Sequence, residues 1–208
     1  MAVTRPYRSP RRAQEASATR GDIMTAAKEL FVARGYARVT VADIAARAGT
    51  AVKTVYASAG GKAGILTELI ATAVANSGAE ETLAEITTTT SLETALTVLA
   101  DGTRRGNESN WTAVGIIYSA MTVHDDAEQV WAQGTTVYRD TLRAVAAHLD
   151  GIDALPTAID VDRAADMLWF CFGTPAWRTL IDDCGWTWDA AAQWLLAQGI
   201  AAFSGAER

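Results

Sequence analysis

The sequence predicts an all-α fold, with an N-terminal three-helix domain that contains a helix-turn-helix, followed by a C-terminal antiparallel helical bundle. Apolar residues recur at helical spacing through most of the chain, and no segment alternates convincingly with the period of a strand. Residues 38–62, RVTVADIAARAGTAVKTVYASAGGK, read as two short helices joined by a glycine turn. The chain has 208 residues, of which 50% are apolar, so it is long enough to bury a sizeable core.

The first of the two short helices begins after Thr40, whose side chain is placed to cap it. Val41, Ile44 and Ala45 then form an apolar stripe, and Gly49 is suited to the left-handed turn that redirects the chain. This pattern predicts that the first helix packs on a core and holds the second helix at a steep angle.

The second short helix is expected over about residues 51–58. Val52 and Val55 share one face, while Lys53, Thr54 and Tyr56 occupy the others. The second helix of a helix-turn-helix fits the major groove of DNA, so DNA binding is the leading hypothesis.

Thr19 and Asp22 have the spacing of a capping box, which predicts that the preceding helix begins at Thr19 and ends at Gly35. Residues 1–18 contain four arginines and are expected to form a flexible basic arm. Two interpretations of this arm stay open: a solubilising tail, or an arm that lies along phosphates or in the minor groove. The expected domains are therefore 1–18, 19–62 and 63–208.

The remainder of the chain is expected to be helical, with breaks at residues 87–90, 106–109, 151–156 and at Gly185. Helix-start signals precede four of these segments. They are Ser91, Asp160, Thr174-Pro175 and Thr187. The predicted helices are 62–77, 91–106, 110–122, 125–149, 160–173, 175–184 and 188–203.

Charge is distributed unevenly between the two predicted domains. Residues 1–62 hold 11 Lys and Arg against 4 Asp and Glu, whereas residues 63–208 hold 7 against 20. A basic N-terminal part on an acidic remainder places the field that attracts phosphate at one end. This split reconciles DNA binding with a net charge of −6.

Several classes of protein are not indicated. No apolar run has the length of a membrane span, the N-terminus lacks the apolar region of a secretory signal, and the two cysteines form no disulfide framework. We therefore expect a cytoplasmic protein that makes no membrane contact. Neither a catalytic constellation nor a metal-ligand spacing is evident, so we expect no enzyme activity, no metal and no cofactor.

Residues 19–66 resemble the DNA-binding domain of the TetR family of bacterial transcriptional regulators. The resemblance rests on Phe31, Gly35-Tyr36, Thr40-Val41, Asp43-Ile44-Ala45, Ala48-Gly49, Thr54-Val55-Tyr56 and Lys62. The tryptophan-rich run at residues 166–196 is similar to the last helices of many such regulators, which build the dimer interface. The resemblance implies a homodimer that binds double-stranded DNA at a palindromic operator.

The chain departs from the family's usual pattern around the second short helix. The family usually has Ser where this chain has Ala51 and Gly61, His in place of Ser58, and an aromatic residue in place of Ala59. These departures predict a weaker phosphate clamp after the recognition helix. We expect Thr50 to take over the helix cap.

The resemblance implies that Thr40, Tyr56 and Lys62 contact phosphates, while Lys53 and Thr54 reach base edges. Arg38 and Arg47 are expected to be solvated charges rather than DNA contacts. The candidate DNA-binding residues are Thr40, Thr50, Lys53, Thr54, Tyr56 and Lys62.

Small-molecule pockets are mostly apolar, with a few placed polar groups, and often lie between helices of a bundle. Aromatic residues at 111–138 fit such a lining, although a filled core explains any one of them equally well. The candidate ligand-binding residues are Arg105, Trp111, Tyr118, Met121, Trp131 and Tyr138.

The sequence thus predicts a DNA-binding regulator, a repressor released from its operator by a small hydrophobic effector. One alternative is a DNA-binding regulator without a small-molecule effector. A second is an α-helical enzyme or ligand carrier that does not bind DNA.

Overall fold

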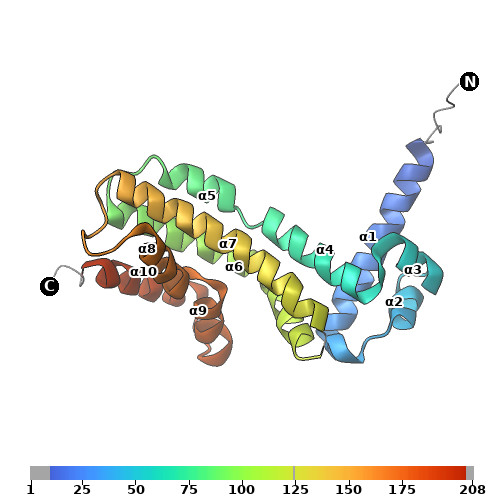
Figure 1. Ribbon diagram of the computed structural model, residues 1–208. Coiled ribbons are helices and arrows are strands. Elements are labelled where there is room, and N and C mark those ends of the chain that lie inside the picture. The colour runs from blue at the N-terminus through green and yellow to red at the C-terminus, as the bar shows by residue number, and fades with distance from the viewer. Residues whose placement is uncertain (1–9, 124, 205–208) are drawn as a thin grey trace, which may run out of the picture. The chain divides into compact units, whose positions relative to one another are not determined.

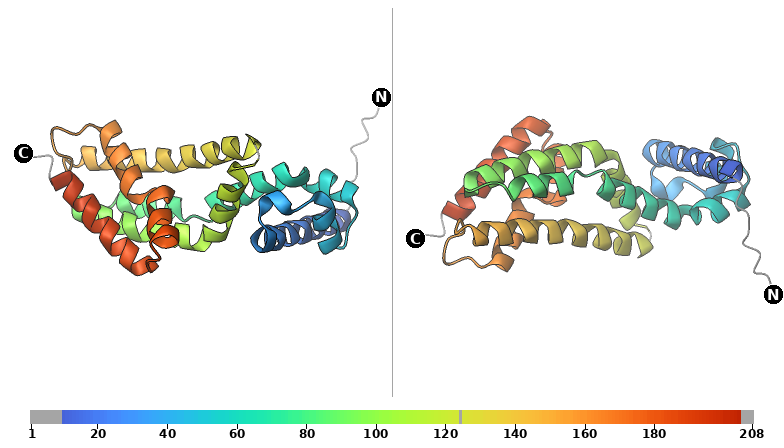
Figure 2. Two further views of the ribbon diagram at one scale, coloured as in Figure 1. Left: turned by 90° about the horizontal axis from the view of Figure 1, so that it is seen from below. Right: turned by 90° about the horizontal axis from the view of Figure 1, so that it is seen from above.

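The computed structural model describes residues 10–123 and 125–204, and all of the regular structure in these ranges is helical. The helices are drawn in Figures 1 and 2. They are α1 (Pro10–Arg34), α2 (Val41–Arg47), α3 (Val52–Ala59), α4 (Gly61–Ala75), α5 (Ala79–Ile86), α6 (Leu92–Met121), α7 (Asp125–Gly151), α8 (Val161–Phe172), α9 (Thr174–Arg178) and α10 (Trp188–Ser204). A 3-10 turn, η1 (Tyr36–Arg38), follows α1, and a π-helical turn, η2 (Thr179–Asp183), follows α9.

The chain divides into two compact units, which we call the head unit and the bundle unit. The head unit is formed by Met1–Ala71 together with Thr112–Trp131, and the bundle unit by Thr72–Trp111 together with Ala132–Arg208. None of the helices in the described residues is both long and apolar enough to cross a bilayer.

In the head unit, α1, α2 and α3 pack against one another around a continuous apolar core. Ile23 and Phe31 of α1, Ile44 of α2 and Val55 of α3 are at most 2% exposed. Burying an aliphatic or aromatic side chain of this size contributes about 2 kcal/mol. The burial of these four side chains therefore fixes how the helix-turn-helix lies on α1.

The start of α1 differs from the sequence-based prediction. The helix begins at Pro10 rather than at Thr19, and Thr19 lies inside it. The Thr19 hydroxyl donates to the Glu15 carbonyl one turn earlier, at 2.9 Å, which satisfies the hydroxyl without a helix end. Of the predicted basic arm, residues 1–9 lie outside the described residues.

The predicted cap of α2 is confirmed. The Asp43 amide donates to Thr40 Oγ1 at 3.1 Å, and the Thr40 amide donates back to Asp43 Oδ2 at 2.8 Å. These two bonds form a capping box that satisfies two backbone donors at once. Gly49, with φ of 63°, makes the predicted left-handed turn between α2 and α3.

In the bundle unit, α5, α6, α7, α8 and α10 share one apolar core, and α7 runs in the direction opposite to α6 (Figure 2). Leu96, Leu142, Leu168 and Leu195 come from four different helices and are at most 3% exposed. Trp177, at the end of α9, is fully buried in the same core.

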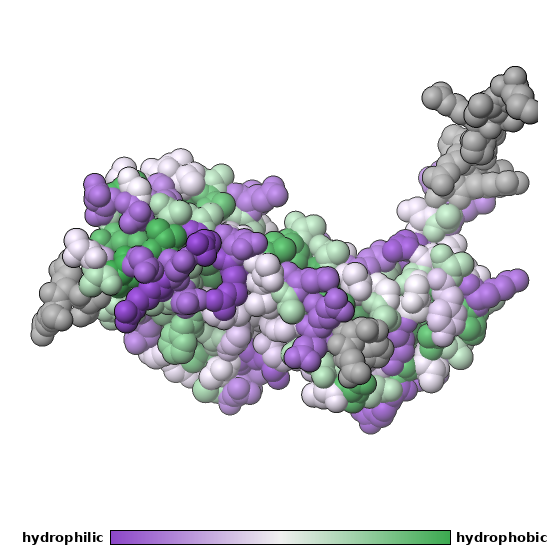
Figure 3. All heavy atoms as spheres, in the orientation of Figure 1, coloured by the Kyte–Doolittle hydropathy of each residue, from purple (hydrophilic) through white to green (hydrophobic). Residues whose placement is uncertain are grey.

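Two polar features hold the helices of the bundle unit together. The Phe172 carbonyl accepts bonds from Tyr138 Oη at 2.7 Å and from Trp177 Nε1 at 3.1 Å, which ties the end of α8 to α7 and α9. On the surface, Arg139 pairs with Asp166 and Arg143 pairs with Asp162, from α7 to α8. Figure 3 shows hydrophilic side chains gathered where these two helices lie side by side.

The start signals of the later helices are mostly confirmed. Ser91 Oγ accepts from the Thr94 amide, Asp160 Oδ1 from the Arg163 amide and Thr187 Oγ1 from the Ala190 amide. The exception is α9, which Gly173 caps, with Thr174 as its first residue and Pro175 in its first turn. Helix α5 was not predicted; it follows Gly78, which has a φ of 69°.

The predicted break at residues 106–109 is wrong, because α6 runs through it without interruption. Ser109 Oγ and Asn110 Nδ2 both donate to the Gly106 carbonyl, and Asn107 Nδ2 donates to the Thr103 carbonyl at 2.8 Å. The polar run therefore satisfies its side chains within the helix. Gly106 has a packing role, since a Cβ there would lie 2.6 Å from the Ser77 carbonyl oxygen.

This packing makes two glycines of α6 respond oppositely to alanine. Gly106→Ala forces a methyl group against backbone and is expected to destabilise the protein by about 1–3 kcal/mol. Gly115→Ala meets nothing within 4 Å and is expected to stabilise by about 0.5–1 kcal/mol through helix propensity. Urea unfolding followed by circular dichroism measures both; a stabilised Gly106→Ala variant would contradict the packing role.

The capping box makes the stability of the head unit depend on pH. Hydrogen bonds from the Thr40 side chain and backbone hold the pKa of the Asp43 carboxyl below its ordinary value, with a smaller contribution from Arg34. Because the folded pKa is lowered, this stabilisation is complete above the ordinary carboxyl pKa of about 3.9 and is lost as the pH falls through the folded value.

Thr40→Ala is therefore expected to destabilise the protein by about 1 kcal/mol at pH 7, and by less at pH 3. Urea titrations at pH 7, 5 and 3 measure the difference from the parent protein. Thr50→Ala is the matched control, because Thr50 does not cap a helix. A Thr40→Ala effect of the same size at all three pH values would exclude the contribution of the Asp43 carboxylate.

Candidate nucleic-acid interface

Helix α3 is anchored by one face and exposed on the others. Val55 is fully buried and Ala59 is 4% exposed, whereas Tyr56 is 57% exposed and Lys53 is also exposed. Thr54 lies half-buried between them. Val52 was expected to share the buried face but is 42% exposed, because it is the first residue of the helix and lies outside the core contacts.

The N-terminus of α3 has no side-chain cap. The capping residue is Ala51, and no side-chain hydrogen bond closes the first turn. The prediction that Thr50 takes over the cap is wrong: the chain turns so that the Thr50 amide donates to the Ala45 carbonyl at 2.9 Å. The Thr54 amide donates to the Ala51 carbonyl at 2.8 Å, so the amides left for an external acceptor, such as a phosphate oxygen, are those of Val52 and Lys53.

Lys62, at the start of α4, has a structural contact that sequence reasoning missed. Its Nζ donates to the Tyr36 carbonyl at 2.7 Å and lies 4.1 Å from the centroid of the Tyr36 ring. Partial burial lowers the pKa of this ammonium. Lys62 therefore ties α4 to the η1 turn, and an ammonium has three donors, so it can also bind a phosphate.

The arginines of the head unit are mostly engaged within the unit. Arg47 pairs with Glu29 at 2.6 Å, and Arg20 pairs with Glu68 at 2.6 Å while also donating to the Ser58 carbonyl. Arg38 donates to the Arg34 carbonyl. Lys53, by contrast, has no ion pair or hydrogen bond from its side chain to any described residue. Lys53, a candidate base-reading residue, therefore has a charge that no ion pair within the described residues neutralises.

The junction between α3 and α4 depends on glycine at three positions. Gly60 and Gly61 have φ of 69° and 76°, and a Cβ on Gly64 would lie 2.1 Å from the Ala59 carbonyl oxygen. The end of α3 and the first turn of α4 are therefore in direct contact. The small residues at Ala59 and Gly61, which depart from the family's usual pattern, belong to this close approach.

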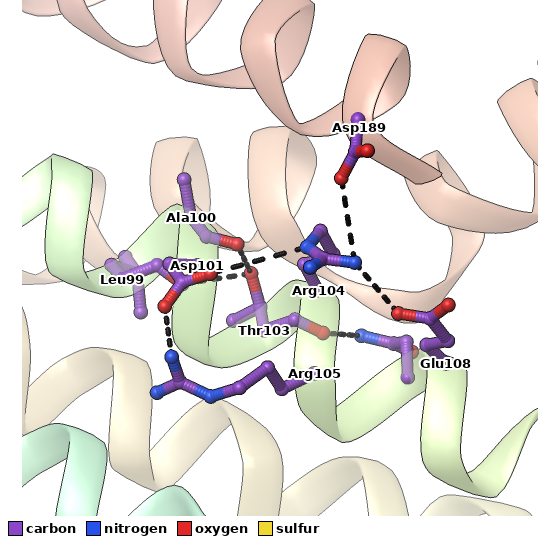
Figure 4. A network of polar contacts seen from close by, with 9 residues as sticks. Leu99, Ala100, Asp101, Thr103, Arg104, Arg105, Glu108 and Asp189 are labelled. Carbon is purple, nitrogen blue, oxygen red and sulfur yellow. Dashed lines mark hydrogen bonds and ion pairs between the residues drawn. The ribbon is translucent and has the colours of Figure 1, made fainter. Parts of the chain in front are cut away.

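Three of the candidate ligand-binding residues lie in the bundle unit and make internal contacts there. Arg105 pairs with Asp101 on its own helix, beside the Arg104 network with Glu108 and Asp189 (Figure 4). Trp111 Nε1 donates to Asp182 Oδ1 at 2.9 Å, and its ring meets the edge of Trp188. The Tyr138 hydroxyl bonds to the Phe172 carbonyl, and burial raises its pKa.

The other three candidates lie in the head unit. The rings of Tyr118 and Trp131 are 4.8 Å apart between centroids, tilted by 56°. Met121, at the end of α6, is half-buried. Five of the six residues thus have internal polar or aromatic contacts, and the proposal that the six line a ligand site remains a prediction.

The two cysteines differ in exposure. Cys171 is buried in the bundle core, where burial raises the pKa of its thiol, and Cys184 is exposed beyond the η2 turn. Among the described residues, no group of three His, Cys, Asp or Glu side chains is arranged to hold a metal ion.

Residues 23–69 match the model of the family described as bacterial regulatory proteins, tetR family. The sequence comparison with curated proteins gave no match. The matched residues cover the C-terminal half of α1, all of α2 and α3, and most of α4, and they include every candidate DNA-binding residue.

Solved structures share the fold over most of the chain. The fatty acid degradation regulator FadR from Bacillus halodurans has a TM-score of 0.68 and 15% identity, covering 92% of this chain and 95% of its own. FadR from Bacillus subtilis, in complex with stearoyl-CoA, has a TM-score of 0.70 and 18% identity, covering 89% and 98%. A SmeT–triclosan complex has a TM-score of 0.68 and 19% identity, covering 89% and 91%.

The family match falls on the helix-turn-helix and its supporting helices, and the all-α fold beyond it is that of TetR-family regulators in the solved structures. Over residues 23–69 the chain thus matches the bacterial regulatory proteins of the tetR family, and over most of its length it shares their fold.

Proposed function

We propose that this protein is a DNA-binding transcriptional repressor that acts as a homodimer on a palindromic operator and is released by a small hydrophobic effector. The observation that carries the DNA-binding part is helix α3, whose Val55 is fully buried while Lys53 and Tyr56 face outward. A helix fixed in this way presents a rigid set of side chains to the major groove.

Charge supports the same assignment. All three lysines of the chain, Lys28, Lys53 and Lys62, lie in the matched region, and the excess of acidic residues lies after residue 62. Attraction to phosphate is therefore concentrated on the part of the chain that carries α3. Thr40, Tyr56 and Lys62 are the proposed phosphate contacts, and Lys53 and Thr54 the proposed base contacts.

The dimer proposal rests on apolar side chains left exposed on α8 and α10. Phe170 is 82% exposed and Trp194 is 44% exposed, with Trp186 beside Trp194 at 6.0 Å between ring centroids. Large aromatic side chains of this kind are enriched at protein interfaces and rarely stay in water in such number. A second copy of the chain, related by two-fold symmetry, would cover them and match a palindromic operator.

The effector proposal rests on the ligands of structural neighbours, which include stearoyl-CoA and triclosan. One observation favours the alternative of a regulator without an effector: the polar groups of Arg105, Trp111 and Tyr138 are already bonded within the bundle unit. Thermal-shift screening with long-chain acyl compounds and hydrophobic drugs, followed by operator release, separates the two. A compound that stabilises the protein and releases DNA supports the effector.

Lysine substitutions test the proposed contacts on α3 and α4. Lys53→Ala is expected to weaken binding to the operator by about 1–3 kcal/mol and binding to scrambled DNA much less, because a base contact carries the sequence information. Lys62→Ala is expected to weaken both alike, reduce the salt slope by about 1, and lower the melting temperature through loss of the Tyr36 contact.

Gel-shift titrations at three salt concentrations, on operator DNA located by footprinting upstream of the protein's own gene, make this measurement. Lys28→Ala removes the same charge from α1 and is the matched control, with a small and sequence-independent loss expected. Equal losses on both DNAs for Lys53→Ala would remove its base-reading role. No salt-sensitive binding to any DNA by the parent protein would contradict the proposed function itself.

A single charge on α8 tests the dimer. Phe170→Glu places two carboxylates in the proposed interface and is expected to weaken self-association by at least ~100-fold, because buried unpaired charges cost several kcal/mol. Light scattering after size exclusion measures the mass, and circular dichroism checks that the helices persist. Ala84→Glu, on an exposed position of α5, is the control; a Phe170→Glu variant that stays dimeric would place the interface elsewhere.

A further inference from the structure

We propose that Gly61 is a positioning residue for Tyr56, holding the exposed ring of the recognition helix in the orientation that binds DNA. This inference rests on the proposed DNA binding and adds a residue to it. It follows from how the ring of Tyr56 and the backbone of Gly61 approach each other.

The ring of Tyr56 occupies the space that a side chain at position 61 would need. A Cβ built on Gly61 would lie 2.8 Å from Cε1, 3.1 Å from Cδ1 and 3.8 Å from Cζ of Tyr56. The first of these distances is shorter than any carbon contact that proteins tolerate without a shift. Any residue other than glycine at position 61 must therefore displace the ring or the backbone.

The backbone around Gly61 has little freedom to move away. Gly60 and Gly61 both have positive φ, and a Cβ on Gly60 would be in ordinary van der Waals contact with the Gly64 Cα, at 3.4 Å. Gly64 in turn approaches the Ala59 carbonyl so closely that a Cβ there would lie 2.1 Å away. Since the junction is closed on this side, the side chain of Tyr56 is the part that gives way.

Contact with Gly61 matters because Tyr56 is otherwise poorly held. The residue is 57% exposed, and an exposed tyrosine on a free helix surface samples several rotamers. Packing one edge of the ring on the Gly61 backbone reduces that freedom before DNA arrives. A hydroxyl that is already in place loses less entropy when it bonds a phosphate.

A double-mutant cycle between positions 56 and 61 tests the inference. Tyr56→Ala is expected to weaken operator binding about tenfold to hundredfold, the usual loss of a hydrogen bond to a charged group. Gly61→Ala is expected to lose a comparable factor in the parent protein and less than about threefold in the Tyr56→Ala background. Equal losses for Gly61→Ala in both backgrounds would show that backbone strain acts alone, and would overturn the proposal.

A second measurement, without DNA, separates this inference from the proposed function. The chain has five tyrosines, so ¹⁹F spectra of protein labelled with 3-fluorotyrosine are simple, and Tyr56→Phe assigns the resonance of Tyr56. Gly61→Ala is expected to shift that resonance and leave the others in place. An unchanged Tyr56 resonance would overturn the proposal, whether or not the parent protein binds DNA.

Strain at a left-handed residue needs its own control. Gly185 has a φ of 71° and nothing within 4 Å of the position of its Cβ, so Gly185→Ala introduces strain without a collision. Gly185→Ala is expected to lower the melting temperature. It should leave the Tyr56 resonance at the position of the parent and the operator affinity within twofold of the parent value. A shift of the Tyr56 resonance in this control would mean that general destabilisation moves the ring, which would also overturn the proposal.

Discussion

The burial of one face of α1 beneath α2 and α3 is the interaction on which the head unit depends. Ile23 and Phe31 lie under the fully buried Ile44 and Val55, so the two short helices are held by a third that is much longer. Short helices are marginal in isolation, and α2 and α3 have only 7 and 8 residues. Their stability therefore comes from this shared core, with the Thr40–Asp43 capping box fixing where the first of them begins.

Several features that depend on residues close by in the chain, such as helix caps and turns, are predicted correctly from the sequence. The caps at Thr40, Asp160 and Thr187 and the turn at Gly49 depend on neighbours a few residues away, and each is found where it is predicted. Distant contacts are less visible. Glycine and polar residues at 106–109 suggest a break, yet Gly106 serves the packing of Ser77, far away in sequence.

The candidate interface shows the same division. Exposure of Lys53 and Tyr56 follows from the helical period, and both are placed as the pattern predicts. The tie from Lys62 to the Tyr36 carbonyl joins residues 26 apart in the chain, which no local pattern reveals. The missing cap on α3 is likewise a property of the turn, because the chain enters the helix through Ala51.

The unequal cysteines of the bundle unit have a practical consequence. Cys171 is shielded in the core with a raised thiol pKa, so it is a poor nucleophile, whereas Cys184 is open to reagents just before α10. The natural sequence thus contains a single addressable thiol. A spin label or fluorophore attached at Cys184 would report distances and motion near α10 in the unmutated chain, with Cys171 remaining silent.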